Sequence, residues 1–567
     1  MTRSIKSRLV VAAALSVASL LSACGGGGSS SNPTPNPNPN PGTTEVTVTG
    51  KITFERPSFK GGQNGLDMTT PVESPARGVV VEALDSTTNA VLASTNTNAT
   101  GDYSVTVPAN RSIFIRAKAQ MVSTTAPTFN FRALNNTNSD ALYALDGSAF
   151  NTGTSNVTRN LKAATGWNGS TYIDTDRAAA PFAILDTAYD VKTLILGAAP
   201  TQNLPALDLY WSVKNKTATG TGGCTDADNG NIGTSFYTTG ADPSCPALPA
   251  GIYILGDYAN GGGDTDEFDD HVIAHEMGHY FEDKFSRSDS QGGDHAPTDR
   301  LDLRVAFSEG WGDAFSGMAM NDPIYRDSRN GVSTNFNFNV ENDTAPDGWF
   351  SEGSVAEILW DIFDPANEPG DTVDLGFTPI YNVMTSTEKS TDALTSIFPF
   401  IASLRANNAA QSAAIGTLLT NESVNGTDDF GSGETHDGGD VSVRPIYPTI
   451  VPNDAPVNVC STVVNGSDSA NKLGNHKFFR FTLNSSATLS LSVTGAADPT
   501  NLASVAATDP DVYVFHRGNF EAVGNDTGAT ETISQHPFSA GTYIIDVYDY
   551  DVQGTAPRCM TLSLQGG

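Results

Sequence analysis

Hydrophobic and polar residues alternate in two parts of the chain, one near each end. Near the N-terminus the alternation runs through short segments at 46–49, 79–83, 103–107 and 113–117, which are separated by turn residues. It returns near the C-terminus at 478–481, 489–493, 511–515 and 541–547. A period of two is typical of strands with one buried face. The pattern therefore predicts two β-sandwiches, over residues 44–122 and 470–567.

The middle of the chain has helical periodicity instead. Apolar residues recur at helical spacing over 175–199, 267–285, 303–319, 352–363 and 390–418. Two strand-like segments, 207–213 and 252–255, precede most of these helices. This order predicts an α+β domain over 165–450, with a connecting segment at 123–164 and a linker at 451–469. The expected fold is multidomain, with an α+β domain flanked by two all-β sandwiches.

The first 24 residues have the composition of an export signal. Three basic residues, Arg3, Lys6 and Arg8, precede an apolar stretch at 9–21 that is too short and too rich in Ala and Ser for a membrane span. The sequence Leu-Ser-Ala-Cys at 21–24 resembles a bacterial lipobox, in which the cysteine receives a lipid. The resemblance implies a cell-envelope lipoprotein anchored through Cys24. An ordinary signal peptide with an incidental cysteine is the alternative.

A Gly/Ser and Asn-Pro linker follows at 25–43, and its alternating prolines favour an extended tether. Gly25 follows the cysteine where lipoprotein sorting to the inner membrane would place Asp. The lipobox resemblance therefore implies the outer membrane or cell surface of a Gram-negative bacterium, or release outside the cell. We expect contact with the membrane through the lipid anchor only.

Length and charge exclude some classes of protein. The 567 residues exceed what one hydrophobic core usually serves. With 31 Lys and Arg against 63 Asp and Glu, the net charge of -32 disfavours binding to nucleic acid. Charged residues make up only 17% of the chain, so the acidity is spread over a solubilising surface rather than gathered in an acidic tail.

The cysteines fit an oxidising compartment. With Cys24 assigned to the lipid, Cys224, Cys245, Cys460 and Cys559 remain, and they form no CxxC motif. Four cysteines allow three pairings. We favour Cys224 with Cys245 and Cys460 with Cys559, because each pair then joins cysteines of the same region of the chain.

The most informative string in the chain is His275-Glu276-Met277-Gly278-His279, which reads HExxH within the helical stretch at 267–285. Residues four apart lie on one face of a helix, so both imidazoles can bind one zinc ion while Glu276 lies beside it. Catalytic zinc takes a third protein ligand from another element. The candidates are His295 and Glu309.

Glu309 and Asp313 lie four residues apart in the next helical stretch, among apolar neighbours where unpaired carboxylates would be costly. Glu309 can bind the metal, while Asp313 can accept the ring N–H of a ligand histidine. HExxH on one helix and ExxxD on the next resemble the gluzincin, or thermolysin-like, metallopeptidases. The interval between the two helices is longer here than in thermolysin, and no thermolysin-type propeptide is recognisable.

The gluzincin resemblance implies a zincin-type catalytic domain with His275, His279 and Glu309 as zinc ligands, Glu276 as general base and Asp313 orienting a histidine. The Gly-Asp-Tyr turn at 101–103 makes the sandwich at 44–122 resemble a carboxypeptidase regulatory-like domain, with a generic spacer sandwich as the alternative. The Asp-Val-Tyr-Val-Phe strand at 511–515 makes the one at 470–567 resemble a bacterial pre-peptidase C-terminal domain, with a generic jelly-roll or carbohydrate-binding sandwich as the alternative. Together these resemblances imply a secreted, lipid-anchored zinc metalloendopeptidase that acts on proteins or peptides as a monomer. The alternative is a surface adhesin whose peptidase-like scaffold is inert.

Other polar residues remain open. His295, Tyr381 and His436 are candidates to stabilise an oxyanion. The aspartates at 264, 266, 269 and 270 are predicted to cap the active helix and to complement its dipole, with a Ca²⁺ site as the second interpretation. His271 is expected to have a surface or capping role, and Glu352 or Glu357 could line the cleft. The expected cofactor is Zn²⁺, with Ca²⁺ as a further candidate.

Overall fold

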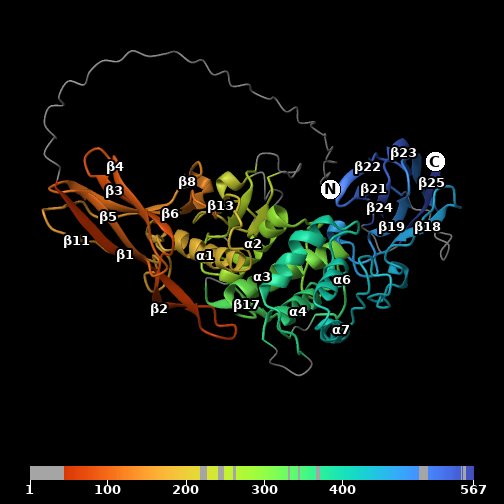
Figure 1. The fold of residues 1–567 in the computed structure, drawn as a ribbon, viewed down its shortest axis with the longest axis horizontal. Coiled ribbons are helices and arrows are strands. Elements are labelled where there is room, and N and C mark those ends of the chain that lie inside the picture. Colours follow the sequence, from red (N-terminus) through yellow and green to blue (C-terminus); the bar gives the residue numbers. More distant parts are fainter. Residues whose placement is uncertain are drawn as a thin grey trace, which may run out of the picture.

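The computed structural model describes residues 44–217, 226–240, 248–259, 263–329, 332–342, 345–365, 371–496, 508–550, 552 and 557–566. Along its longest axis the N-terminal strands, the helices and the C-terminal strands follow one another in chain order (Figure 1). A multidomain, strand-rich architecture with a helical middle is therefore confirmed.

The N-terminal strands form because apolar residues alternate along them. In β5, Tyr103, Val105 and Val107 are buried while the residues between them are exposed. Strand β1 is the centre of its sheet and pairs with β2 and β5 antiparallel and with β11 and β12 parallel. The N-terminal strands are β1 (Glu45–Phe59), β2 (Leu66–Pro75), β3 (Val79–Asp85), β4 (Val91–Asn96), β5 (Asp102–Pro108), β6 (Ser112–Ser123), β7 (Phe129–Asn135), β8 (Ala141–Leu142), β9 (Ala144–Asp146), β10 (Phe150–Asn151), β11 (Val157–Thr158) and β12 (Leu161–Ala163).

The second sheet runs without a break from the N-terminal sandwich into the middle of the chain. Its order is β14-β15-β13-β7-β6-β3-β4, where β13 is Leu207–Trp211, β14 is Phe236–Thr238 and β15 is Gly251–Ile254. Strand β7 pairs antiparallel with β6 and parallel with β13. Residues 123–164, which we expected to be a connecting segment, thus contain strands β7 to β12. Several of these strands have only two or three residues, too few for the alternation to register in the sequence.

Four of the predicted helical stretches are single helices in the structure, whereas the short helix at Phe377–Val383 was not predicted. The stretch 390–418 forms two helices rather than one, because α6 ends at Asn407 and α7 begins at Ser412. The helices are α1 (Ala180–Ala198), α2 (Asp270–Phe285), α3 (Leu303–Met320), α4 (Glu352–Phe363), α5 (Phe377–Val383), α6 (Ile397–Asn407) and α7 (Ser412–Asn421). A hairpin of β16 (Ile324–Arg329) and β17 (Thr334–Asn339) follows α3.

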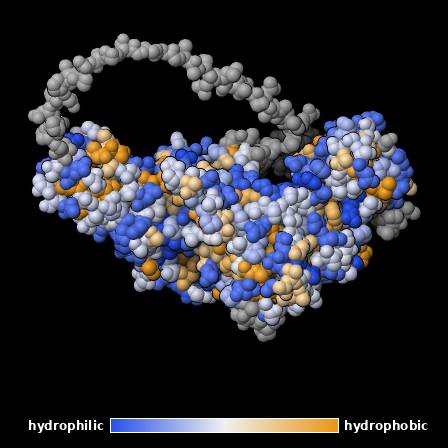
Figure 2. All heavy atoms as spheres, viewed as in Figure 1, coloured by the Kyte–Doolittle hydropathy of each residue, from blue (hydrophilic) through white to orange (hydrophobic). Residues whose placement is uncertain are grey.

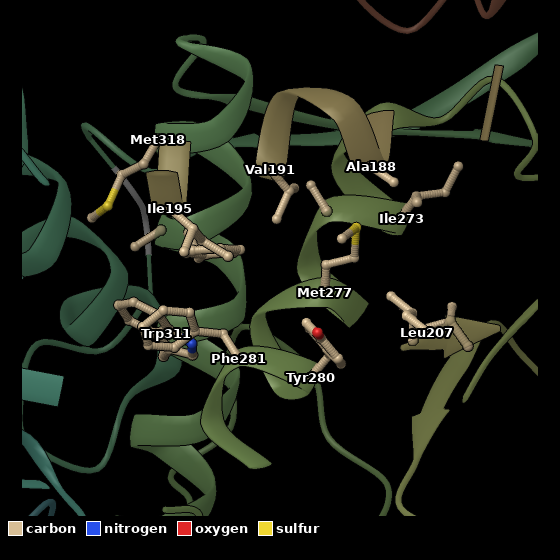
Figure 3. Packing of buried hydrophobic residues seen from close by; sticks show 14 of the residues in the cluster. Ala188, Val191, Ile195, Leu207, Ile273, Met277, Tyr280, Phe281, Trp311 and Met318 are labelled. Carbon is tan, nitrogen blue, oxygen red and sulfur yellow. The ribbon is translucent and has the colours of Figure 1, made fainter. Parts of the chain in front are cut away.

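One hydrophobic core joins the N-terminal sandwich to the helices. Around the central helix α2, Met277 and Phe281 pack with Trp311 of α3, Ile195 of α1 and Leu207 of β13 (Figure 3). The face of the molecule seen in Figure 2 is largely hydrophilic with scattered apolar residues. Within the described residues, no helix combines the length and apolar character needed to span a bilayer.

The C-terminal sandwich has its own core between two four-stranded sheets, in the orders β18-β25-β20-β23 and β19-β24-β21-β22. Its strands are β18 (Val457–Ser461), β19 (Lys477–Leu483), β20 (Ala487–Ala496), β21 (Pro510–His516), β22 (Asn519–Gly524), β23 (Thr530–Phe538), β24 (Gly541–Asp549) and β25 (Arg558–Gly566). A disulfide between Cys460 and Cys559 joins β18 to β25, which confirms that predicted pair. Cys24, Cys224 and Cys245 lie outside the described residues.

Candidate metal centre

Helices α2 and α3 approach each other closely because glycines face each other between them. A Cβ built on Gly278 would lie 3.1 Å from Cα of Gly312, and Trp311 Nε1 donates to the carbonyl of Gly278 over 3.0 Å. A Cβ on Gly312 would lie only 2.7 Å from the His275 ring. The glycines thus bring the histidines of α2 against the carboxylates of α3.

The predicted ligands converge at this contact. Nε2 of His275 lies 3.2 Å from Nε2 of His279 and 3.3 Å from Oε2 of Glu309, and the His279 to Glu309 distance is 3.4 Å. A tetrahedral zinc with bonds of about 2.0–2.1 Å would separate its ligand atoms by about 3.3–3.4 Å. Two imidazole nitrogens and one carboxylate oxygen are also a donor set that zinc prefers in catalytic sites. The residues present therefore fit a zinc ion.

Each ligand histidine has a carboxylate on its other ring nitrogen. Nδ1 of His275 lies 2.9 Å from Asp313 Oδ1, and Nδ1 of His279 lies 3.2 Å from Glu282 Oε2. Ser308 donates to the same Glu282 oxygen over 2.6 Å. With Nδ1–H donated to a carboxylate, each ring presents the lone pair of Nε2 to the metal position. Asp313 has the neighbour that the sequence predicted for it, whereas Glu282 was not anticipated in this role.

These carboxylates also set the charge of the centre. Burial alone would lower the pKa of His275, but hydrogen bonds to Asp313 and Glu309 outweigh burial and raise that pKa to about 10. Burial would raise the pKa of Glu309, yet the neighbouring charge of His279 and hydrogen bonds from both rings hold it well below its usual range. The centre therefore has a strong affinity for positive charge, which either protons or a divalent cation can supply.

Glu276 lies at the edge of the centre and is only partly exposed. Its Oε2 accepts a hydrogen bond of 2.7 Å from the backbone N–H of Tyr237 in β14. Burial raises its pKa, and the nearby charges of His275 and His279 partly oppose this rise. A carboxylate with a raised pKa, held beside a metal position, is suited to take and return a proton.

His295 reaches the same place from the segment between α2 and α3. Its Nε2 lies 3.5 Å from Glu309 Oε2, and its Nδ1 lies 2.7 Å from Glu352 Oε2. Burial would lower its pKa, but the hydrogen bond to Glu352 raises it to about 9. One ligand atom each from His275, His279 and Glu309 lie within 4.8 Å of one another, and His295 does not belong to this group. Of the two third-ligand candidates, the geometry thus favours Glu309, with His295 beside the ligand set.

The other oxyanion candidates lie in different surroundings. The Tyr381 hydroxyl donates to Gln202 over 3.2 Å, and its ring packs on Phe281 in the core. His436 packs against Phe350 at a ring-centre distance of 5.1 Å. Of the three candidates, the structure brings His295 to the ligand set.

The surface or capping role expected for His271 is wrong. The residue is buried, and its Nε2 lies 3.1 Å from the backbone carbonyl of Asp322, at the C-terminal end of α3. The side chain therefore fastens α2 to the end of α3. The sequence around His271 gave no sign of this contact because Asp322 is 51 residues away.

The aspartates at the start of α2 do not cap the helix as predicted, but Asp270 lies in its first turn, where its charge complements the helix dipole as predicted. Asp269 occupies the N-cap position, but its side chain makes no cap hydrogen bond. It instead accepts from the backbone N–H and hydroxyl of Ser328 in β16. Asp270, in the first turn, forms an ion pair with Arg56 of β1. Both carboxylates thus bind distant strands rather than the helix end.

A second group of carboxylates lies where this loop meets β16. Oxygens of Asp264, Asp266 and Asp327 lie within 4.8 Å of one another. Asp266 is 3% exposed, and one oxygen of each carboxylate is buried without a hydrogen-bond partner among the described residues. Burial and the charge of Asp327 raise the pKa of Asp264 to about 6. Asp327 was missing from the predicted set because it lies on a strand 61 residues beyond Asp266 in the numbering.

Comparison with known proteins gives one family match. Residues 262–418 match the Mycolysin C-terminal domain family, and this stretch contains both helices of the metal centre. The search of curated proteins found no match. The chain therefore carries a peptidase-related domain that includes the candidate centre.

Two solved structures are similar to parts of the chain. The pre-peptidase C-terminal domain of collagenase from Bacillus anthracis has 16% identity and a TM-score of 0.16, and the match covers 21% of this chain and 93% of that one. A periplasmic inhibitor of g-type lysozyme from Aeromonas hydrophila has 16% identity and a TM-score of 0.13, and the match covers 21% of this chain and 97% of that one.

Proposed function

We propose that this chain is a zinc metalloendopeptidase of the gluzincin type. The observation that carries the proposal is the spacing of His275, His279 and Glu309, which corresponds to three corners of a zinc tetrahedron, with Glu276 beside them. The three protein ligands leave the fourth position for water, as hydrolytic zinc sites require. An inert structural zinc site would close that position with protein and would have no need of Glu276.

Bound zinc would supply a water of lowered pKa and would polarise the scissile carbonyl of a peptide. Glu276 takes the proton of the attacking water and returns it to the leaving amine. Asp313 and Glu282 keep the ligand rings in the correct orientation and tautomer. His295, held by Glu352, donates from Nε2 to the carbonyl oxygen as negative charge develops there.

The sheet offers a place for an extended substrate. Strand β14 stands at the end of the strand order, and the N–H of Tyr237 in it binds Glu276, so this strand edge lies beside the metal centre. Extended peptides bind to such strand edges through main-chain hydrogen bonds. We therefore propose that proteins or peptides lie along β14 and cross the metal centre, as internal cleavage requires.

The decisive test compares Glu276→Gln with Glu45→Gln, a matched change at an exposed residue of β1. Glu276→Gln is expected to keep the zinc and lose about 10²- to 10⁴-fold in kcat/KM on a casein-type substrate, because only the base is removed. Glu45→Gln is expected to leave both unchanged. Undiminished cleavage by Glu276→Gln would overturn the proposal. Zinc binding without cleavage in the wild type would favour the inert-scaffold alternative.

We also propose that the protein acts as a monomer in the cell envelope, attached through a lipid on Cys24. Intact mass of the secreted form tests the anchor, because a mature chain that begins at Cys24 with a diacylglycerol has a defined mass. A chain that is cleaved elsewhere and carries no lipid would overturn it.

We propose Ca²⁺ as a second ion, held by Asp264, Asp266 and Asp327. Hard cations prefer clustered carboxylate oxygens. The buried oxygen of Asp266 that lacks a partner among the described residues is the observation that favours a ligand here, because an unsatisfied buried carboxylate is costly.

A further inference from the structure

The segment that carries His295 has no regular structure of its own. Residues 286–302, called here the His295 segment, join α2 to α3 without a helix or a paired strand. Such a segment does not hold a side chain in place by itself. The contact between His295 and Glu352 therefore depends on what else holds the segment.

The first residues of the segment are held by the helical region, where Ser286 and Arg287 donate to the carbonyls of Met384 and Ala393. The part that contains His295 is held by the C-terminal sandwich. Residues 462–476, called here the sandwich loop, connect β18 to β19. Asn471 Nδ2 donates to the carbonyls of Gly292 and Asp294 over 3.0 and 3.1 Å. The N–H of Asp294, the residue before His295, donates to Ser469 Oγ over 3.1 Å. Both backbone polar groups of Asp294 are thus bound by the sandwich loop.

Lys472 adds a buried charge to the same contact. It is 5% exposed, its Nζ donates to the carbonyl of Asp294 over 2.5 Å, and it forms an ion pair with Asp299 at 3.2 Å. The N–H of Leu473 donates to the carbonyl of Arg300 over 2.8 Å. These contacts therefore hold residues 292–300 of the His295 segment, on both sides of His295.

The sandwich loop is itself firmly attached. Asn475, fully buried, donates to the carbonyl of Thr462 over 2.8 Å and closes the base of the loop. Arg304, in the first turn of α3, reaches across to Asp546 of β24 over 3.0 Å, and His476 holds the other Asp546 oxygen at 2.8 Å. Arg304 and Asp546 are both buried, so this ion pair fixes the sandwich against the helix that carries Glu309.

We propose that the C-terminal sandwich is a positioning part of the active site, in which Ser469, Asn471 and Lys472 hold the His295 segment so that His295 lies beside the metal ligands. This inference rests on the proposed peptidase function. It has a clear consequence: the sandwich cannot be removed during maturation without loss of activity, although the zinc ligands themselves would remain.

The test uses the full-length protein with Lys472→Met, which keeps the aliphatic chain and removes the charge, and Ser469→Gly, a milder change at an exposed residue with φ of 57°. The matched control is Thr482→Val, which removes an exposed hydroxyl contact elsewhere in the same sandwich. Amide hydrogen exchange over 286–302, zinc content, kcat and KM are measured for each protein.

We expect amide exchange in the His295 segment to rise about tenfold or more in Lys472→Met and less in Ser469→Gly, with α2 and the zinc content unchanged. The kcat should fall about tenfold in Lys472→Met while KM changes less than about twofold. In a His295→Gln background, Lys472→Met should cause no further loss, because the effect passes through His295. Thr482→Val should behave as the wild type.

Full activity with unchanged exchange in both variants would overturn the inference. So would a loss of kcat in Lys472→Met that is just as large in the His295→Gln background, because the sandwich would then act through general stability. If Lys472→Met does not fold, Ser469→Gly with His295→Gln completes the same cycle. Amide exchange can be measured without turnover. If the wild type fails to cleave peptides, the proposed function is refuted, but the exchange result still tests the contact between the sandwich loop and the His295 segment.

Discussion

The glycine at the contact between α2 and α3 provides a sharp test of the metal centre. In Gly312→Ala the added Cβ would lie 2.7, 2.8 and 2.9 Å from three atoms of the His275 ring. Ordinary contacts begin at 3.4 Å, so the ring would have to retreat by about 0.7 Å. It has little freedom to do so, because Asp313 holds Nδ1 and the metal would hold Nε2.

Two opposing effects set the size of the change. Alanine is better than glycine in a helix by about 1 kcal/mol. Forcing an extra methyl group into a packed contact costs about 1–3 kcal/mol. We therefore expect Gly312→Ala to lower the free energy of unfolding by up to about 2 kcal/mol. Displacement of the ring should weaken zinc binding by about 10- to 100-fold, as disturbed ligand orientation does elsewhere.

The matched control is Gly416→Ala in α7, where the nearest atom to the added Cβ is 3.6 Å away, an ordinary contact. This variant should be slightly more stable than the wild type and should bind zinc normally. Zinc affinity is measured by competition with a chelator, and stability by chemical unfolding of the metal-free proteins. Wild-type zinc affinity in a folded Gly312→Ala protein would refute the ligand role of His275 argued from this contact.

Three further predictions concern other groups. Asp313→Asn and Glu282→Gln should each lower zinc affinity by about 10- to 100-fold in the same competition assay, because each weakens the hydrogen bond that orients one ligand ring; unchanged affinity in both would contradict that role. Burial raises the pKa of Glu388 well above its usual range, so the folded chain binds a proton that the unfolded chain releases, and stability falls as pH rises towards the raised pKa. Glu388→Gln should therefore raise the thermal midpoint more at pH 8 than at pH 5, and equal shifts at both pH values would argue against this linkage. Millimolar Ca²⁺ should raise the thermal midpoint of the wild type but not that of Asp266→Asn, and equal shifts in both proteins would place the ion elsewhere.

The strands and helices were predictable where a pattern is long and local. The alternation in β5 and the helical spacing around His275 each extend over several residues, and the structure has the elements they predict. The continuous sheet through β6, β7 and β13 was not predictable, because parallel pairing between β7 and β13 joins segments more than 70 residues apart. The boundary between the sandwich and the helical domain therefore does not appear as a break in the fold.

In the metal centre, too, the geometry within one helix was predictable, whereas contacts between distant segments that share no motif were not. HExxH and ExxxD each lie within one turn of a helix, so their geometry is visible in the sequence. Glu282 could also have been found, because it lies three residues after His279 on the same helix. The pairing of His295 with Glu352 could not, because it depends on how two distant segments fold together.

The role of each of these buried carboxylates depends on the group it contacts rather than on its neighbours in the sequence. Asp313 lies against a histidine and orients a ligand, whereas Asp546 lies against Arg304 and fastens the sandwich to α3. One oxygen of Asp266 has no partner among the described residues, which is why a cation is the natural explanation there. All three residues are buried aspartates. Only the group that faces each carboxylate therefore determines whether it orients a ligand, attaches the sandwich or binds a metal. For Asp266 and Asp546, the sequence therefore shows the carboxylate but not the element that faces it.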